Sequence, residues 1–254
     1  MKLQPGTQYV YEMDTKTAMN VTGLSTTQTI NSILDFKVTA GEGTDRLLTI
    51  SYEKLSSEMN TPMGVIKFNS DDPNLNSMKG VLSQPFTMTI AENGTIKKIE
   101  GLERTEHVTP GEDDDAMKQV KATLTDSAIR TSMAYMLDIY PDNPVKPGDT
   151  WVKKTVIPLA GVNIRVENNF KLLSIDKQTA HIEVKAKITE GKGEMSMVKV
   201  DLKGSSEGTL DVDTETGFMT ASKMKQDIDG MMSMGTKSAP LKMNIEMNIT
   251  GKKK

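Results

Sequence analysis

Alternation of apolar and polar residues is the feature that most constrains how this chain folds. From Leu241 to Ile249 every second residue is apolar, and the residues between them are Lys, Asn, Glu and Asn. A period of two predicts antiparallel strands that bury one face and leave the other in water. Turns such as Asn93-Gly94 separate the runs, and several runs are long enough to curl into a barrel or half-barrel. Further alternating runs lie at residues 9–13, 34–38, 48–53, 86–90 and 182–188.

Between Pro110 and Pro141 the apolar residues are spaced by three and four instead. This spacing predicts a helical segment over residues 112–139. The contiguous acidic residues 112–115 suit a helix start, where the helix dipole is positive, better than a calcium loop, whose ligands alternate with spacers. We interpret residues 125–127 as a kink or a new N-cap between two helices.

The two halves of the chain repeat one pattern. Residues 3–9 and 145–151 each place a Pro-Gly pair just before a strand that carries an aromatic residue. A later strand with a Phe-Lys pair also recurs, at residues 35–38 and 169–172. The repeat indicates two related β-meanders, which form either two domains or one continuous curved sheet. We favour one sheet, because an amphipathic helix needs an apolar surface to cover.

The predicted fold class is therefore mostly β. Long antiparallel meander strands form one curved sheet or half-open barrel built of two related halves, with the central helical segment packed on its concave face. We expect a single domain, residues 1–254, whose pseudo-repeat halves 3–109 and 145–250 are joined by the helical segment 112–139. The polar stretch 69–84 is expected to be a long loop, with a short helix in its second part.

Composition excludes several classes of function. The chain has no cysteine, which excludes disulfides and cysteine ligands, and its two histidines, His107 and His181, are expected at the surface. The net charge of −3 argues against a general nucleic-acid binder. No apolar segment reaches the length of a membrane helix. Because no nucleophile–base pair is visible, we expect no enzymatic activity, no metal and no cofactor.

Two motifs have a structural and a functional interpretation. Gly204-Ser205-Ser206-Glu207-Gly208 matches the nucleophile elbow of hydrolases, but that motif needs a helix after it, and we predict a hairpin turn here instead. The 19 methionines suggest either core filling or soft copper(I) ligands, as at residues 195–197 and 231–234. Copper sites usually add His or Cys, so we predict core filling.

The order of motifs resembles a known family. Tyr140-Pro141 precedes a Val-Lys-Pro-Gly-Asp-Thr-Trp run at 145–151, and Thr-Ala-His-Ile-Glu-Val at 179–184 follows. This resembles a family of uncharacterised Bacteroidota-type secreted proteins, usually made with a lipoprotein signal peptide. The resemblance implies an extracytoplasmic location, in the periplasm or anchored to the outer membrane through a lipid on a cysteine that this chain lacks. A looser likeness is to periplasmic lipoprotein carriers, whose half-open barrel has a helical lid over an apolar cavity.

We accordingly predict a non-enzymatic extracytoplasmic binding protein for a hydrophobic ligand, a lipid or acyl chain. The alternative is a structural or interaction module of the cell envelope with a fully packed core, which binds a partner protein or glycan. The volume under the helices separates the two, because a packed interior has only water-sized voids. The expected ligand-binding residues are apolar side chains of the helical segment and the sheet: Met117, Val120, Leu124, Met133, Met136, Leu137, Met88, Met243 and Met247.

Overall fold

The computed structural model describes the whole chain except residues 1, 73–81, 83, 103–124, 160–161 and 196–197. The described residues form thirteen strands and one complete helix, α3 (Asp126–Leu137). The strands are β1 (Gln8–Val21), β2 (Leu24–Ala40), β3 (Arg46–Thr61), β4 (Gly64–Asn69), β5 (Phe86–Ile90), β6 (Ile96–Glu100), β7 (Thr150–Leu159), β8 (Val162–Asp176), β9 (Thr179–Glu190), β10 (Lys192–Met195), β11 (Val198–Asp213), β12 (Met219–Met234) and β13 (Lys237–Lys253).

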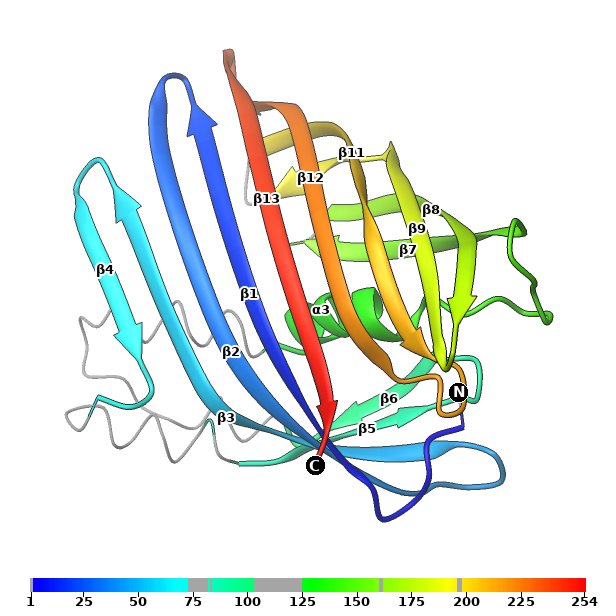
Figure 1. Ribbon diagram of the computed structural model, residues 1–254. Coiled ribbons are helices and arrows are strands. Elements are labelled where there is room, and N and C mark those ends of the chain that lie inside the picture. The colour runs from blue at the N-terminus through cyan, green and yellow to red at the C-terminus, as the bar shows by residue number, and fades with distance from the viewer. Residues whose placement is uncertain (1, 73–81, 83, 103–124, 160–161, 196–197) are drawn as a thin grey trace.

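All thirteen strands belong to one antiparallel sheet. Its order is β6-β5-β3-β2-β1-β13-β12-β11-β9-β8-β7, with β4 paired to the far part of β3 and β10 to the start of β11. The first and last strands of the chain therefore lie side by side in the middle of the sheet (Figure 1). The order has two ends, so the sheet is open. It curls around α3, which confirms the predicted curved sheet or half-open barrel.

The alternation of the sequence separates the two faces of the sheet. The concave face carries the core, in which Tyr11, Phe36 and Ile249 are buried from neighbouring strands. On the convex face, residues of opposite charge are Cα partners across successive strands. One such row runs Lys16, Glu246, Lys225, Glu207 and Lys185 from β1 to β9. If one strand shifted by one residue against its neighbour, these charged side chains would turn toward the core. The apolar face and the charged face therefore favour the same pairing of the strands.

The Gly204–Gly208 motif corrects one prediction, because it lies in the middle of β11 and not in a hairpin turn. A side chain on Gly208 would place its Cβ 2.1 Å from the carbonyl oxygen of Lys223 on β12, and one on Gly204 would place it 2.6 Å from that of Asp227. Neighbouring backbone thus approaches both residues more closely than any Cβ allows. Glycine at such points lets a sheet bend strongly. The close approach of β12 therefore explains why Gly204 and Gly208 are glycines.

Helix α3 packs inside the curl, as predicted for the helical segment (Figure 1). The Oγ1 atom of Thr125 accepts a hydrogen bond from the backbone N–H of Ala128 at 3.2 Å, which confirms the N-cap predicted at residues 125–127. Ile129, Met133 and Met136 of α3 are buried in the same core as the sheet residues. Residues 112–124 of the predicted helical segment and most of the predicted loop 69–84 lie outside the described residues.

The two Pro-Gly turns that suggested an internal repeat have the same construction. The backbone N–H of Gly6 donates to the carbonyl oxygen of Val38 at 2.8 Å, and that of Gly148 donates to Leu172 at 2.7 Å. Both glycines have a positive φ, of 88° and 96°. The likeness of the turns agrees with the repeat, while a single domain with superposable halves 3–109 and 145–250 stays a prediction.

Candidate functional site

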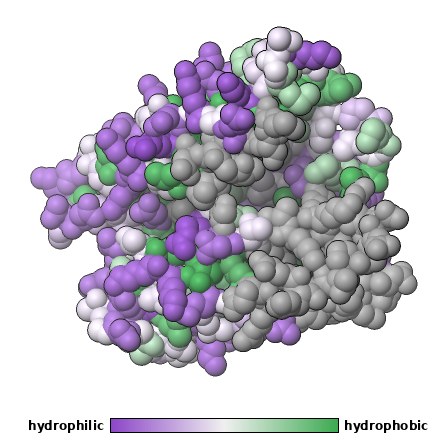
Figure 2. All heavy atoms as spheres, turned by 180° about the vertical axis from the view of Figure 1, so that it is seen from behind, coloured by the Kyte–Doolittle hydropathy of each residue, from purple (hydrophilic) through white to green (hydrophobic). Residues whose placement is uncertain are grey.

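A pocket of about 420 Å³ separates the first half of α3 from the concave face of β1, β2 and β3. It is partly open to solvent. Seen from behind, hydrophobic residues gather near the middle of the molecule, bordered by hydrophilic ones (Figure 2). The described residues that line the pocket are Met13, Thr15, Gln28, Ile30, Ser32, Leu34, Tyr52, Leu55, Met59, Ala128, Ser132 and Met133.

Every one of these lining residues is uncharged. The few polar groups are amide and hydroxyl groups, and two of them are already engaged: Gln28 Nε2 lies 3.4 Å from Ser57 Oγ, and the Ser132 hydroxyl donates to the carbonyl oxygen of Ile129 at 3.0 Å. Burial raises the pKa of the Tyr52 phenol well above its ordinary value, so this side chain is neutral at physiological pH. The pocket therefore suits an uncharged, mainly apolar ligand and offers it a few hydrogen-bonding groups.

The opposite side of α3 is packed instead. A void of only about 30 Å³ separates it from β7, β8, β9, β11 and β12, which is the size of a single water. Asp138 borders this void, and its Oδ2 accepts a hydrogen bond from Thr155 Oγ1 at 3.2 Å. Burial raises the pKa of the Asp138 carboxyl, and the bond from Thr155 opposes that shift. Helix α3 thus has a filled side and an open side.

The structure distributes the predicted ligand-binding residues unevenly. Met133 is buried in the core and also lines the pocket, whereas Met136, Leu137 and Met88 are buried in the core and do not line the pocket. On β13, Met247 belongs to that core, and Met243 packs against a second apolar cluster around Leu202 and Leu241. Met117, Val120 and Leu124 lie outside the described residues. The role of these nine residues in binding stays a prediction.

Most of the residues that line the pocket were not among the predicted ligand-binding residues. Met13, Leu34 and Tyr52 stand in the alternating runs, which place them correctly on the buried face of the sheet. Alternation alone cannot tell that α3 leaves this part of the face uncovered. Met59 lies beyond the alternating run of β3 that we recognised, because a bulge near Ile33 and Leu34 shifts the register there.

At the surface, charged side chains form ion pairs, such as those of Lys67 with Glu58 and Arg165 with Glu190. His181 points to the convex side, as predicted, and is half-exposed; its Nδ1 lies 2.7 Å from Asp211 Oδ1, a partner that the sequence did not indicate. His107 lies outside the described residues. Within the part of the chain that the structure describes, no group of three His, Asp or Glu residues could hold a metal ion. No helix in that part is long and apolar enough to cross a membrane.

Comparison with known proteins places the chain in a family. A family model described as a family of unknown function (DUF6263) matches residues 44–219. The chain belongs to DUF6263. This confirms the expected membership of a family without assigned function, whereas the Bacteroidota-type lipoprotein character stays a prediction. No curated protein matches this DUF6263 chain.

Among solved structures, the DUF6263 chain is similar to lipovitellin, in a structure that concerns its lipid–protein interactions. The TM-score is 0.55, and 99% of this chain aligns at 8% sequence identity. The match covers 25% of the lipovitellin chain, so this protein spans about a quarter of that length. At this identity the likeness shows a shared fold and nothing more.

Proposed function

We propose that this protein binds a hydrophobic ligand, a lipid or acyl chain, in the pocket between α3 and strands β1–β3. The observation that carries the proposal is the size and lining of that pocket. A volume of about 420 Å³ lies in the range of small-molecule sites and far above the voids of a packed core. With no charged residue in its described lining, the pocket favours methylene groups, each worth about 0.8 kcal/mol on burial.

Three methionines give the pocket an adaptable wall. Met13 comes from β1, Met59 from β3 and Met133 from α3, so they approach the pocket from three elements. Unbranched thioether side chains change rotamer at little cost and follow an irregular surface. This property suits acyl chains, whose length and bending vary. Hydroxyl and amide groups such as Ser32 and Gln28 then contact the more polar end of the ligand.

The likeness to lipovitellin supports the proposal as an analogy of fold. In that protein the solved structure concerns lipid–protein interactions. A large open antiparallel sheet provides a broad concave apolar face, which a lipid can occupy when helices leave part of it uncovered. In this chain α3 leaves the concave face of β1–β3 uncovered at the pocket.

The proposed role is that of a binding protein and not of an enzyme. The described lining of the pocket has no acid–base pair and no charged group that would stabilise a developing charge. We also propose an extracytoplasmic location, which follows from the resemblance of the motifs around Trp151 to secreted envelope proteins. A carrier or scavenger of envelope lipids combines these properties.

Filling the pocket tests the proposal. Ser132 lines it from α3, so Ser132→Phe places a ring in the space that the ligand would occupy. We expect a dansyl-labelled fatty acid to fluoresce with wild type and with Ser132→Ala, which removes only the hydroxyl, but not with Ser132→Phe. The melting midpoint of each variant controls for folding. Equal binding by Ser132→Phe, or no binding by wild type, would instead favour the structural or interaction module.

A further inference from the structure

Three neighbouring hairpins expose large apolar side chains at their tips. Leu24 follows the β1–β2 turn and is 62% exposed, Met63 in the β3–β4 turn is 98% exposed, and Met234 at the end of β12 is 58% exposed. The hairpins are consecutive in the sheet, in the order β4-β3-β2-β1-β13-β12. Their tips lie at one end of the sheet, at the top of Figure 1. We call these three tips the hairpin rim.

The hairpin rim is almost free of charge in a chain of which 26% is charged. Residues 17–34 and 59–66 contain no charged residue, and residues 230–241 contain only Lys237. The opposite end of the same sheet differs, because its turns carry Glu42, Asp45, Lys177 and Glu215. The two ends face the same solvent, so sheet formation does not account for the difference. Exposed apolar side chains that gather in one region of a surface mark contact with a partner protein or a membrane.

The rim continues into the candidate pocket. Gln28 lines the pocket and lies four residues from Leu24 on the same face of β2. At the rise of a β-strand this separation is about 13 Å. On β3, the lining residue Met59 lies four residues before Met63. Between rim and pocket these two strands carry no charged side chain, so an acyl chain would meet no ionic barrier along the way.

We propose that the hairpin rim docks on a phospholipid surface. Separate protruding tips suit a soft planar surface, which all three can enter at once, better than a folded protein, which would need a continuous complementary patch. Burial of Leu24, Met63 and Met234 among acyl chains drives the docking, and Lys237 faces the headgroups. The docking is independent of the proposed function, since it requires no occupied pocket, although it would bring the pocket to a source of lipid.

Vesicle flotation tests the docking. Vesicles of equimolar phosphatidylcholine and phosphatidylglycerol should carry wild-type protein upward, and the triple variant Leu24→Ser, Met63→Ser, Met234→Ser should partition at least about tenfold less. The matched control is Val152→Ser, Leu173→Ser, Ile175→Ser, three similarly exposed apolar residues of β7 and β8, which should float like wild type. The proposal would be overturned if the rim variant floated as well as wild type. It would also be overturned if the wild type did not float. A wild type that floats but fails to bind dansyl fatty acid would refute the pocket and leave the docking intact.

The absence of cysteine from the chain allows a second, site-resolved test. An environment-sensitive fluorophore on Met63→Cys should shift to the blue when vesicles are added, and the same label on Thr44→Cys, at the opposite end, should not. Salt should change the shift little, because the rim holds a single cation. Equal shifts at both positions would contradict docking by the rim. So would a shift at Met63→Cys that rises with protein concentration without vesicles, since it would assign the rim to contact between two copies.

Discussion

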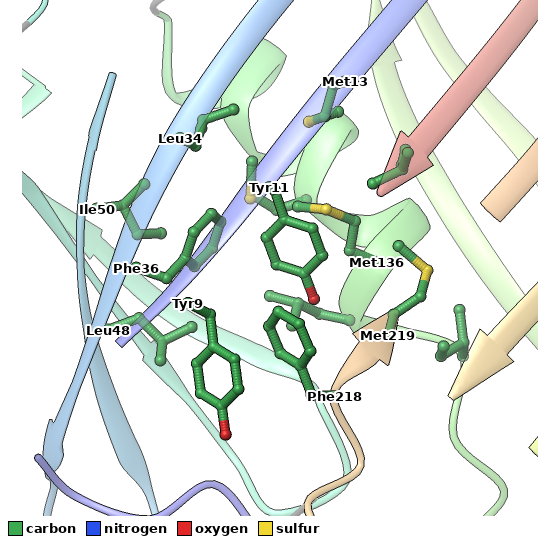
Figure 3. Close-up of a cluster of buried hydrophobic side chains, with 14 of the residues drawn as sticks. Tyr9, Tyr11, Met13, Leu34, Phe36, Leu48, Ile50, Met136, Phe218 and Met219 are labelled. Atoms are coloured by element: carbon green, nitrogen blue, oxygen red, sulfur yellow. The ribbon is translucent and has the colours of Figure 1, made fainter. Parts of the chain in front are cut away.

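At the scale of single residues, two tyrosines near the core differ in what their hydroxyl groups contact. Tyr9 is 2% exposed, and its ring stacks on Phe218 with ring centroids 3.9 Å apart (Figure 3). Its hydroxyl has no hydrogen-bond partner among the described residues. The Tyr140 hydroxyl instead donates to the carbonyl oxygen of Gly217. A buried hydroxyl without a partner costs stability, whereas a bonded one contributes to it.

The phenylalanine variants of these two tyrosines should therefore change stability in opposite directions. Tyr9→Phe keeps the stacked ring and removes the unpaired hydroxyl, so we expect the free energy of unfolding to rise by about 1 kcal/mol. Tyr140→Phe leaves the Gly217 carbonyl without its donor and should lower it by about 1 kcal/mol. Urea denaturation measures both. A loss of stability in Tyr9→Phe would show that its hydroxyl has a partner.

Asp138 makes stability depend on pH in an unusual direction for a carboxyl. Burial raises its pKa above the ordinary value of 3.8, so the folded state binds its proton more tightly than the unfolded chain does. The contribution of Asp138 to stability is most favourable below pH 3.8 and is lost as the pH rises through the raised pKa of the folded state. Asp138→Asn should thus be more stable than wild type at about pH 7, with the difference shrinking at about pH 3. Urea denaturation at both values tests this, and a constant difference would contradict it.

At the scale of elements, α3 was predictable and its two different sides were not. The three- and four-residue spacing marks the helix, and Thr125 marks its start. Whether each apolar residue of α3 meets close-packed neighbours or a pocket depends on strands distant in sequence, such as β1 and β3. The same limit explains the misread Gly204–Gly208 motif, since the approach of β12 that demands glycine is not visible in β11 itself.

Truncations on α3 should reveal its two sides. Met136 is fully buried in the packed core, so Met136→Ala opens a new cavity and should cost about 2–5 kcal/mol (Figure 3). Met133 is as buried as Met136 but borders a pocket that exists already, so Met133→Ala should cost clearly less. Chemical denaturation of the two variants gives the comparison. Equal costs would mean that the pocket side is as well packed as the core side.

At the scale of the whole molecule, the alternating runs predicted the mostly β antiparallel sheet because their length and period leave few other folds. Its curl depends on contacts between strands. Gly208→Ala should strain the bend against the Lys223 carbonyl and cost about 1–3 kcal/mol. Ser206→Ala, two residues away on the same face of β11, should change the free energy of unfolding by less than about 0.5 kcal/mol. If thermal or urea unfolding gave the same stability for the two variants, Gly208 would not be required for the curvature of the sheet.

The sequence predicted an apolar site between the helical segment and the concave face of the sheet, but it did not indicate that the pocket lies on β1, β2 and β3. Native mass spectrometry of the purified protein is the most direct test of the claim that this pocket holds a lipid. We expect a population that carries one lipid-sized mass, which is restored by phospholipid after delipidation and is absent from Ser132→Phe. Spectra that show only the bare chain before and after addition of phospholipid and fatty acid would contradict the account.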